Sequence, residues 1–576
     1  MARYLVTSAP PYANGPIHLG HVIGAYLPAD VYVRTLRRMG EEVLYVCGGD
    51  EYGVAITVNA EREGVEYGAY AQRWRDEIKA TFDAFGIEFD VWSGTSTSPS
   101  HHALSQEFFQ RLHANGFLDE RSNEQLYCTT DERFLADRYV VGTCYVCGYE
   151  KARGDECPRC ATWLDPLRLT SPRCAVCGNE PERRRTTHWY LDLPKLRDAG
   201  IDEWFRGHGW KPNVEAFVGA MLDDLQARAI TRDLRWGVPV PADVLAASAS
   251  DEDLSGKVLY VWFDAPIGYA SFTRDLAEER GDPELFERFW KDPESRLVHF
   301  IGKDNIPFHC LIFPSMLFGT QEGYVLPWKV PAMEFYNLQG AKFSTSENWN
   351  IPLGPFFERF DRDCARFHLL SSAPESSDSE FRWEEFQRTV DELADKIGNL
   401  ATRVLRFSAK HFDGAVPPLR AEDEAELDSI LLTECGDVHD PGEHVLENRY
   451  RKATEALLAN ASVGNVFIDR MAPWALRKSD PERAASVLNT AAEWIALVAR
   501  WATPFLPEKA ELLWRMLGAD GEAAATPWPV RPQPGTWRSL GTPRLGPIEG
   551  PFAKIPDEVI EAEIAALEAR KRPSSA

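Results

Sequence analysis

The chain has 576 residues, of which 44% are hydrophobic and 26% charged, and it carries a formal net charge of −25. Because this length exceeds what one hydrophobic core can serve, we expect about three or four domains. The acidic balance argues against broad, non-specific nucleic-acid binding, although a local basic face could still bind a shaped RNA. The sequence contains no run of about eighteen apolar residues, so it predicts no membrane span.

The first fifty residues predict an α/β fold. Residues 3–8 form an apolar strand and not a leader peptide, because the apolar stretch stops at the prolines 10–11. We therefore expect a cytoplasmic protein with reduced thiols. A helix follows at about 17–39, kinked at Pro28, and a second strand spans 42–46. This spacing indicates parallel strands, with ligands bound at their carboxyl ends.

A short histidine turn lies at this predicted edge. His18-Leu19-Gly20-His21 follows a Gly/Pro/Asn loop, and Asp50 follows the second strand. His18 and His21 lie three residues apart on the first helical turn, so both side chains could meet a phosphate together with backbone N–H groups. Gly20 would let a nucleotide approach the backbone closely. Neither G-x-G-x-x-G nor a Walker sequence is present, so the pattern favours neither a dinucleotide site nor a P-loop.

A second loop with related chemistry lies far along the chain. Lys342-Phe343-Ser344-Thr345-Ser346 follows the small-residue turn Gly340-Ala341. Its lysine and hydroxyl groups would bring donors to a triphosphate from the side opposite the histidine turn. Two separated loops of this kind suit ATP chemistry that depends on position and charge and uses no protein nucleophile.

Four cysteines between the loops predict a structural zinc site. Cys144, Cys147, Cys157 and Cys160 form two C-x-x-C pairs separated by nine residues. Four thiolates satisfy tetrahedral zinc and leave no open position for catalysis. A disulfide framework is disfavoured in a reducing compartment.

A second metal site is suggested by a further C-x-x-C pair. Cys174 and Cys177 form this pair, and Cys128 and Asp131 repeat its spacing with a carboxylate in the second place. These four residues could close a site, with His188 as a competing fourth ligand, or the second pair could hold no metal. The remaining cysteines are expected to pack in the core: Cys47, Cys310, Cys364 and Cys435.

The middle of the chain predicts a return to the sheet and a pocket beside it. Residues 257–262 and 298–304 read as strands of this sheet. Asp304, at the end of the second strand, is placed to accept hydrogen bonds from ribose hydroxyls. Three further residues could line a small apolar pocket or simply pack in the core: Trp262, Tyr269 and His309.

Together these motifs resemble the class I methionyl-tRNA synthetases, from about Arg3 to at least Lys478. The similar blocks occur in the family's order around the cysteine insertion: P-Y-A-N-G-P-I-H-L-G-H at 11–21, R-W-G-V-P-V-P at 235–241, W-F-D-A-P-I-G-Y at 262–269 and G-K-D-N-I-P-F-H at 302–309. The resemblance implies a Rossmann-like parallel-sheet domain, an inserted zinc-knuckle connective domain and an α-helical bundle that binds the anticodon.

The resemblance also implies an activity with assigned residues. ATP, with Mg2+, would activate L-methionine to methionyl-adenylate, and the methionyl group would pass to the 3′ end of tRNA(Met). His18, His21 and Lys342 would act on the phosphates, and Asp50 would hold the substrate ammonium. ATP would also contact Gly20, Gly302, Asp304, Ser344, Thr345 and Ser346. Methionine would lie among Ala9, Pro10, Tyr12, Trp262, Ala265, Pro266, Tyr269 and His309. A soft, apolar pocket of this kind suits a thioether.

Three positions depart from the family pattern. Thr345 stands where K-M-S-K-S has its second lysine, and losing one preorganised cation can cost about a hundredfold in rate. Lys342 could carry the electrostatics alone, or a nearby basic residue could substitute. Pro10 replaces a usual leucine and Tyr52 a usual histidine, which alters the expected pocket in detail but not the fold.

The last third predicts a helical bundle. Apolar residues recur at steps of four and three over 386–407, which is one face of a long helix. Further helical patterns follow at 443–469, 481–517 and 558–570. Asn399 and Arg403 lie four residues apart, with Trp474 beyond the next helix. In the resembling family these positions read the anticodon, and their chemistry suits unstacked bases.

The expected organisation places the catalytic domain at 1–117 and 232–330, the insertion at 118–231, a connecting segment with the lysine loop at 331–385, the bundle at 386–517 and an extension at 518–576. We expect a monomer that does not bind membranes. Thr345 and Pro10 leave two alternatives open. One is a diverged paralogue that adenylates another amino acid or serves an acceptor other than tRNA. The other is a non-catalytic, zinc-containing tRNA-binding protein.

Overall fold

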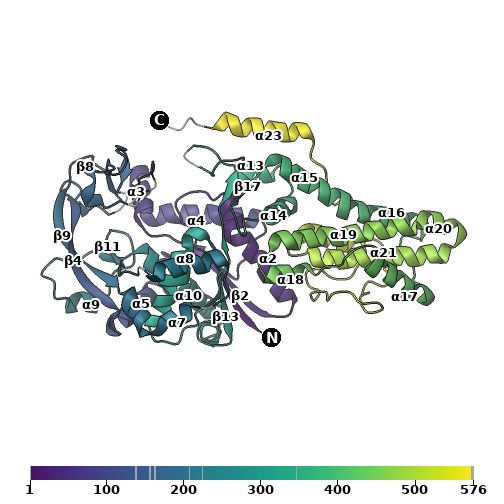
Figure 1. Ribbon diagram of the computed structural model, residues 1–576, viewed down its shortest axis with the longest axis horizontal. Coiled ribbons are helices and arrows are strands. Elements are labelled where there is room, and N and C mark those ends of the chain that lie inside the picture. Colours follow the sequence, from purple (N-terminus) through teal and green to yellow (C-terminus); the bar gives the residue numbers. More distant parts are fainter. Residues whose placement is uncertain are drawn as a thin grey trace.

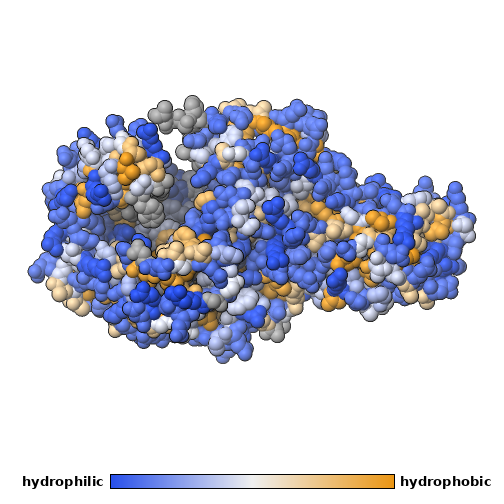
Figure 2. Space-filling view, viewed as in Figure 1, coloured by the Kyte–Doolittle hydropathy of each residue, from blue (hydrophilic) through white to orange (hydrophobic). Residues whose placement is uncertain are grey.

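The computed structural model describes residues 2–136, 139–154, 157–160, 162, 164–206, 208–223, 225–344 and 347–571. The molecule is elongated, with an α/β region at one end and a bundle of long helices at the other (Figure 1). Hydrophilic residues cover most of the face drawn in Figure 2, and hydrophobic residues gather along the bundle. Within the described ranges, no helix combines the length and apolar character that a membrane crossing requires.

The central sheet is parallel, as the sequence predicts. Its middle strand, β1 (Arg3–Ser8), pairs with β2 (Glu42–Gly49) on one side and β13 (Ser295–Gly302) on the other. The outer strands are β3 (Val91–Gly94) and β14 (Pro327–Lys329), and β15 (Ala332–Met333) pairs with the end of β13. Buried apolar side chains on both faces explain the near-continuous apolar runs of these strands.

The first helix is divided where the sequence places Pro28. A short α1 (Leu19–His21) leads through a π-helical turn, Val22–Tyr26, into α2 (Leu27–Arg38). Pro28 lies in the first turn of α2, where a missing N–H is tolerated. Because the π turn precedes it, the histidine turn is separated from the regular helix behind it.

The insertion is a long antiparallel ribbon that carries the cysteines. Strand β4 (Leu118–Cys128) pairs with β9 (Glu182–Leu191), flanked by β5 (Arg133–Phe134) and β10 (Arg228–Ala229). A small sheet of β6 (Val140–Thr143), β7 (Ala152–Arg153) and β8 (Thr170–Cys174) lies between them in the chain. The helices before and after the ribbon are α3 (Val54–Glu63), α4 (Tyr67–Ala84), α5 (His101–Ala114), α6 (Leu193–Leu196), α7 (Asp202–Phe205), α8 (Pro212–Asp223) and α9 (Ala242–Ala247).

The prediction of a central-sheet strand at 257–262 is wrong. Strand β12 (Lys257–Leu259) ends early and pairs with β11 (Thr231–Asp233) in a separate two-stranded sheet. From Val261 the chain continues as the helix α10 (Val261–Arg280), which contains Trp262. A short apolar run has no period that distinguishes a strand from a buried helix start, and this helix is buried along most of its length.

The connecting segment holds the lysine loop between two short paired strands. Strand β16 (Tyr336–Leu338) precedes the loop and pairs in parallel with β17 (Ser379–Phe381). The helices around this region are α11 (Glu284–Trp290), α12 (Phe313–Gly319), α13 (Leu353–Phe357) and α14 (Arg362–Ser371).

The bundle contains the predicted helices, each interrupted. The pattern at 386–407 spans α15 (Trp383–Leu393), a π turn at Ala394–Gly398 and α16 (Asn399–His411). The pattern at 443–469 falls on α18 (Pro441–Leu446) and α19 (Tyr450–Met471), and that at 481–517 on α21 (Pro481–Ala502) and α22 (Pro507–Met516). The remaining helices are α17 (Ala421–Ser429), α20 (Pro473–Ser479) and the terminal α23 (Asp557–Arg570), which lies along α15 (Figure 1).

A buried arginine ties the bundle to the sheet. The Arg366 guanidinium, on α14, donates hydrogen bonds to the Asp30 carboxylate (2.7 Å), the Phe85 carbonyl (2.9 Å) and the Pro504 carbonyl (2.7 Å). The first two acceptors belong to the α/β region and the third to the bundle. Breaking such a pair by removing one partner typically costs about 3–5 kcal/mol, because a charge is then buried alone.

Candidate active site and metal clusters

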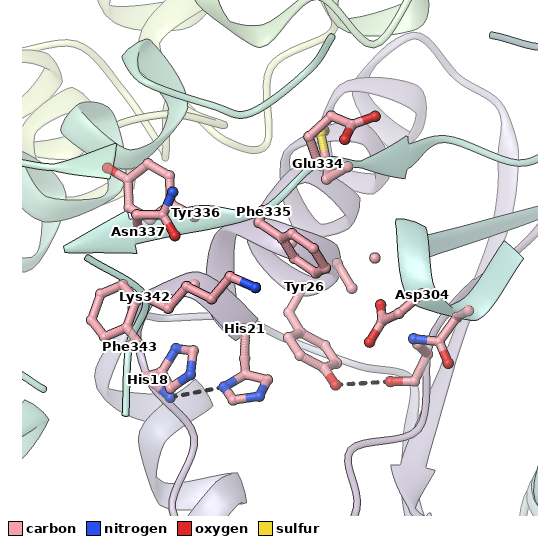
Figure 3. A pocket seen from close by; sticks show the side chains of 17 residues that line it. His18, His21, Tyr26, Asp304, Glu334, Phe335, Tyr336, Asn337, Lys342 and Phe343 are labelled. Carbon is pink, nitrogen blue, oxygen red and sulfur yellow. Dashed lines mark hydrogen bonds between the residues drawn. The ribbon is translucent and has the colours of Figure 1, made fainter. Parts of the chain in front are cut away.

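A cavity of about 290 Å³ lies between the histidine turn and the lysine loop (Figure 3). It opens at the carboxyl ends of β1 and β13, the edge where parallel sheets bind ligands. Six of its lining residues are among the phosphate and ATP contacts expected from the sequence: His18, Gly20, His21, Gly302, Asp304 and Lys342. After that expectation we call it the nucleotide cavity.

The two histidines hold each other in a defined arrangement. The backbone N–H of His18 donates a hydrogen bond to Nδ1 of His21 (3.2 Å), so the hydrogen of the neutral His21 ring is on Nε2. The two ring centroids lie 3.9 Å apart. A Cβ on Gly20 would lie only 3.0 Å from the His18 ring and 3.1 Å from the Tyr336 carbonyl oxygen. Close packing therefore favours glycine here, besides any approach of a nucleotide.

Burial keeps both imidazoles neutral. Burial, with a smaller contribution from the charge of His21, lowers the pKa of His18 to about 2. Burial also lowers the pKa of His21 to about 4. At neutral pH the histidines therefore offer N–H donors and no net charge, while the exposed Lys342 offers a full positive charge.

The lysine loop is braced by aromatic rings. Nζ of Lys342 lies 5.3 Å from the ring centroid of Phe335, and Figure 3 shows the lysine extending over the cavity toward this ring. Ser344 and Trp349 exchange two backbone hydrogen bonds (3.0 and 2.8 Å), which close the turn. The predicted ATP contacts Thr345 and Ser346 lie outside the described residues.

A second cavity of about 370 Å³ adjoins the first. Both are lined by Ala9, His21, Tyr26, Asp304 and Asn305, so ligands in the two cavities would meet at this boundary. Eight of its lining residues are among the methionine contacts expected from the sequence: Ala9, Pro10, Tyr12, Asp50, Trp262, Ala265, Pro266 and His309. After that expectation we call it the amino-acid cavity.

A buried carboxyl group faces the amino-acid cavity. Asp50 is 7% exposed, and its Oδ1 accepts a hydrogen bond from the Tyr52 N–H (3.4 Å). Burial, followed by the negative charge of Asp264, raises the pKa of Asp50 well above its usual value. A cationic group placed beside this carboxyl would reverse that effect and favour the ionised form.

A hydrogen-bond chain fixes His309 in one tautomer. Nδ1 of His309 lies 3.2 Å from the carbonyl oxygen of Asn305, which can only accept, so Nδ1 carries the hydrogen. Nε2 then accepts a hydrogen bond from the Tyr269 hydroxyl (2.8 Å). Tyr269 thus supports the cavity from behind His309 and does not itself line it.

Part of the amino-acid cavity wall is aromatic and flat. The rings of Trp262 and Phe308 stack with centroids 3.9 Å apart and planes at 9°. The Tyr12 hydroxyl accepts a hydrogen bond from the Ile56 N–H (3.3 Å). Tyr12 also lines the cavity. Tyr52, where the family usually has histidine, is buried, and its hydroxyl lies 2.6 Å from Nε2 of His102.

Several lining residues were not predicted from the sequence. They include Tyr26, Asn305, Phe308, Glu334, Phe335, Tyr336 and Phe343. Phe335 is 40% exposed, a property that the sequence alone does not reveal. Phe308 and Asn305 lie inside the G-K-D-N-I-P-F-H block, in which the sequence analysis assigns roles only to Gly302, Asp304 and His309.

The first cysteine cluster has the geometry of a tetrahedral sulfur site. The ligand atoms of Cys144, Cys147, Cys157 and Cys160 all lie within 4.8 Å of one another. Individual Sγ–Sγ distances are 3.9 Å (Cys144–Cys160) and 3.6 Å (Cys147–Cys157). Zinc–sulfur bonds of about 2.3 Å in a tetrahedron place sulfurs about 3.8 Å apart, so the donor set fits zinc.

The second cluster also closes, with a carboxylate as one of its four members. Cys128, Asp131, Cys174 and Cys177 lie within the same 4.8 Å limit. Oδ2 of Asp131 is 3.2 Å from Sγ of Cys128 and 3.0 Å from Sγ of Cys174. The predicted competitor His188 lies elsewhere: its ring is buried against Thr231 (3.0 Å) and Asp233 (3.2 Å), which removes it from the ligand set.

On the bundle, three predicted residues lie on neighbouring helices. Asn399 begins α16 and Arg403 follows one turn later, while Trp474 lies on α20 and is 39% exposed. The Arg403 guanidinium lies 5.0 Å from the Trp474 ring centroid and donates a hydrogen bond to Asp469 (2.7 Å). An aromatic face and a planar cation are thus presented together at the surface.

Comparisons with known proteins agree with this architecture. Residues 4–405 match the model of the family described as tRNA synthetases class I (M), and residues 421–566 match the anticodon binding domain of methionyl tRNA ligase. Methionine–tRNA ligase of Salinibacter ruber is 43% identical over 99% of this chain and 81% of its own length. That of Rubrobacter xylanophilus is 42% identical over 97% of this chain and 96% of its own length.

Solved structures of methionyl-tRNA synthetase have the same fold. Mycobacterium tuberculosis methionyl-tRNA synthetase in complex with methionyl-adenylate superposes with a TM-score of 0.74 at 25% identity, covering 96% of this chain and 100% of that one. Fold and cavities therefore define an α/β nucleotide-using enzyme that carries a helical domain. The chain belongs to the methionyl branch of the class I tRNA synthetases. The family resemblance and the fold class predicted from the sequence are both confirmed.

Proposed function

We propose that the chain uses ATP to activate methionine as methionyl-adenylate and then transfers the methionyl group to the 3′ end of tRNA(Met). The observation that carries this proposal is the boundary shared by the two cavities, at Ala9, His21, Tyr26, Asp304 and Asn305. A carboxylate leaving the amino-acid cavity and an α-phosphate leaving the nucleotide cavity would meet there. No side chain at this boundary needs to act as a nucleophile, so the reaction depends on position and charge.

The proposed step is a displacement at phosphorus. A methionine carboxylate oxygen attacks the α-phosphate, a new O–P bond forms, and the bond to the β-phosphate oxygen breaks to release pyrophosphate. Lys342 would balance the charge that develops on the leaving pyrophosphate, while His18 and His21 donate hydrogen bonds to phosphate oxygens. Asp304 would accept from the ribose hydroxyls. Magnesium would accompany ATP and add charge compensation on the phosphates.

The amino-acid cavity suits methionine for chemical reasons. Asp50, once ionised beside a cation, would hold the ammonium group through a charge-assisted hydrogen bond. The stacked Trp262 and Phe308 rings and the Ala265 and Pro266 surfaces offer the thioether an apolar, polarisable wall. His309, neutral because burial lowers its pKa to about 4, would face the sulfur without adding charge.

We also propose that both cysteine clusters hold structural zinc. Four ligands leave no position open for substrate at either cluster, and no cluster residue lines either cavity. Elemental analysis is expected to give two zinc ions per chain, falling to one for Cys128→Ser. A content of one in the unaltered protein would remove the second site.

The bundle surface would read the tRNA. The Trp474 face offers stacking, and Arg403 and Asn399 offer hydrogen bonds, which together suit unstacked anticodon bases. Both cavities, both clusters and this surface lie within one chain, so we propose that a single copy is competent.

The test is methionine-dependent ATP–pyrophosphate exchange, measured with each of the twenty amino acids, followed by charging of tRNA(Met) and of a tRNA with an altered anticodon. Exchange with methionine alone and charging of tRNA(Met) alone are expected. Exchange with another amino acid would favour a diverged paralogue. Tight tRNA binding without exchange would favour a non-catalytic binding protein.

A further inference from the structure

One contact joins the two loops of the nucleotide cavity directly. The phenyl ring of Phe343, in the lysine loop, lies flat on the imidazole of His18, in the histidine turn. Their centroids are 4.4 Å apart and their planes differ by 8°. Figure 3 shows the two rings beside each other, with Lys342 extending from the same loop over the cavity. Residues far apart in the sequence are thus coupled at the place where phosphates would bind.

Packing contacts restrain the His18 ring. Besides Phe343 they include the His21 ring, at 3.9 Å between centroids, and Gly20, where an added Cβ would come within 3.0 Å of the His18 ring. Nδ1 of His18 is buried and has no hydrogen-bond partner among the described residues. Without a hydrogen bond at Nδ1, the orientation of this ring depends more strongly on the rings packed against it.

The lysine loop around Phe343 is short and closed. The backbone hydrogen bonds between Ser344 and Trp349 end the loop, and the Trp349 indole donates a hydrogen bond to the Leu338 carbonyl (2.9 Å). Lys342, immediately before Phe343, places its ammonium over Phe335. Whatever fixes the Phe343 ring therefore also fixes where the lysine leaves the backbone.

We propose that Phe343 is a positioning residue for ATP, because its stack on His18 sets the plane of the imidazole and holds Lys342 over the nucleotide cavity. The inference rests on the proposed function and deepens it. The phosphate contacts are made by His18 and Lys342, and Phe343 acts through them. The pairing joins the two loops before ATP arrives, so less ordering is left for ATP binding to accomplish.

Simple core packing would make a different prediction. Phe343 is only partly buried and borders the nucleotide cavity, while the amino-acid cavity is lined by other residues. A residue that only stabilised the fold would change the melting temperature and disturb both substrates alike. A positioning residue would change ATP and leave methionine unaffected.

The experiment compares Phe343→Leu, which keeps apolar bulk but removes the flat ring, with Phe343→Tyr, which keeps the ring. Phe407→Leu is the matched control, because Phe407 also contacts a histidine, His411, with centroids 4.5 Å apart, but lies on the bundle. Each protein is measured for the KM of ATP and of methionine in pyrophosphate exchange, for the Kd of ATP by calorimetry, and for melting temperature.

Phe343→Leu is expected to raise the KM and Kd of ATP about five- to tenfold, as loss of one aromatic pair would. The KM of methionine should stay within about twofold, Phe343→Tyr should recover most of the ATP affinity, and Phe407→Leu should resemble the unaltered protein. The proposal fails if ATP binding by Phe343→Leu is unchanged, if both substrates weaken equally, or if tyrosine does not restore binding.

The calorimetric arm separates this inference from the proposed function. Absence of methionine-dependent exchange in the unaltered protein would overturn the function. Even then, weaker ATP binding by Phe343→Leu than by the unaltered protein would support the role of Phe343. Equal ATP binding by the two proteins would reject it.

Discussion

The nucleotide cavity and the amino-acid cavity share a boundary but are built in opposite ways. In the nucleotide cavity Lys342 and Asp304 are exposed, and Phe335 beside them is 40% exposed. Away from the shared boundary, the amino-acid cavity keeps its polar groups nearly out of water: Asp50 is 7% and His309 3% exposed. The nucleotide cavity thus exposes charged groups to solvent. In the amino-acid cavity, burial disfavours the charge of Asp50 until a cationic substrate enters.

This difference matches the ligands we propose for each cavity. A triphosphate is large and highly charged, so an exposed ammonium group can meet it. A small zwitterion with an apolar side chain is selected better by buried polar groups whose partners it alone supplies, because unpaired buried groups penalise the wrong ligand. Rate should therefore depend chiefly on the first cavity and amino-acid selection on the second.

The largest effect should follow from Lys342→Ala. Removing the exposed ammonium from the nucleotide cavity should lower kcat for pyrophosphate exchange about a hundred- to a thousandfold, because charge on the transferring phosphates loses its balance. The KM of methionine should change little, since Lys342 does not line the amino-acid cavity. Steady-state kinetics with each substrate varied in turn checks both statements. A methionine KM that rises in parallel would contradict the separation of the two cavities.

Asp50→Asn should produce the reverse pattern. The loss of the carboxylate should raise the KM of methionine by about tenfold to a hundredfold, the cost of one charge-assisted bond, with the KM of ATP nearly unchanged. Melting temperature should hold or rise, because burial disfavours the charge of Asp50 in the empty cavity. Equal loss of affinity for both substrates would show that Asp50 supports the fold and not one ligand.

The pH dependence should also differ between the cavities. Burial and Asp264 raise the pKa of Asp50, so in the empty site the carboxyl group holds its proton at low pH, and the ammonium must displace it. Methionine KM should therefore fall as pH rises through the raised pKa of Asp50, by at most tenfold per pH unit. His18 and His21, whose pKa values burial lowers to about 2 and about 4, stay neutral throughout, so the KM of ATP should stay flat. A methionine KM independent of pH would contradict this protonation state of Asp50.

The sequence was informative where a function needs residues close together in the chain. The histidine turn, the two C-x-x-C pairs and the parallel strands at 3–8 and 42–46 are local patterns, and the structure contains each of them. Predictions from the sequence were wrong where an element or a ligand depends on residues distant in the chain. The run at 257–262 fits either a strand or the start of a helix. The strand ends at Leu259, and the buried helix α10 begins at Val261. His188 has ligand chemistry but is held by Thr231 and Asp233, which no spacing rule reveals.

The same limit explains why Phe343 was quoted within the lysine loop but given no role. Its partner, His18, belongs to a different loop, so the stack exists only once the chain has folded. Motif comparison assigns chemistry to charged and hydroxyl groups and assigns no role to an aromatic residue between them. The residues that position a catalytic group are thus harder to predict than the group itself.

The smallest effect expected concerns a residue behind the amino-acid cavity. Tyr269→Phe removes the hydroxyl that donates to Nε2 of His309 and leaves Nδ1 bonded to the Asn305 carbonyl. The ring should keep its tautomer but lose one restraint, which is typically worth about 1 kcal/mol, so the KM of methionine should rise about fivefold. The KM of ATP should not move, because Tyr269 does not line the nucleotide cavity. If Tyr269→Phe weakened ATP binding as much as methionine binding, the two cavities would be coupled through His309. The contrast between exposed charges in one cavity and buried polar groups in the other would then not explain how each substrate is bound.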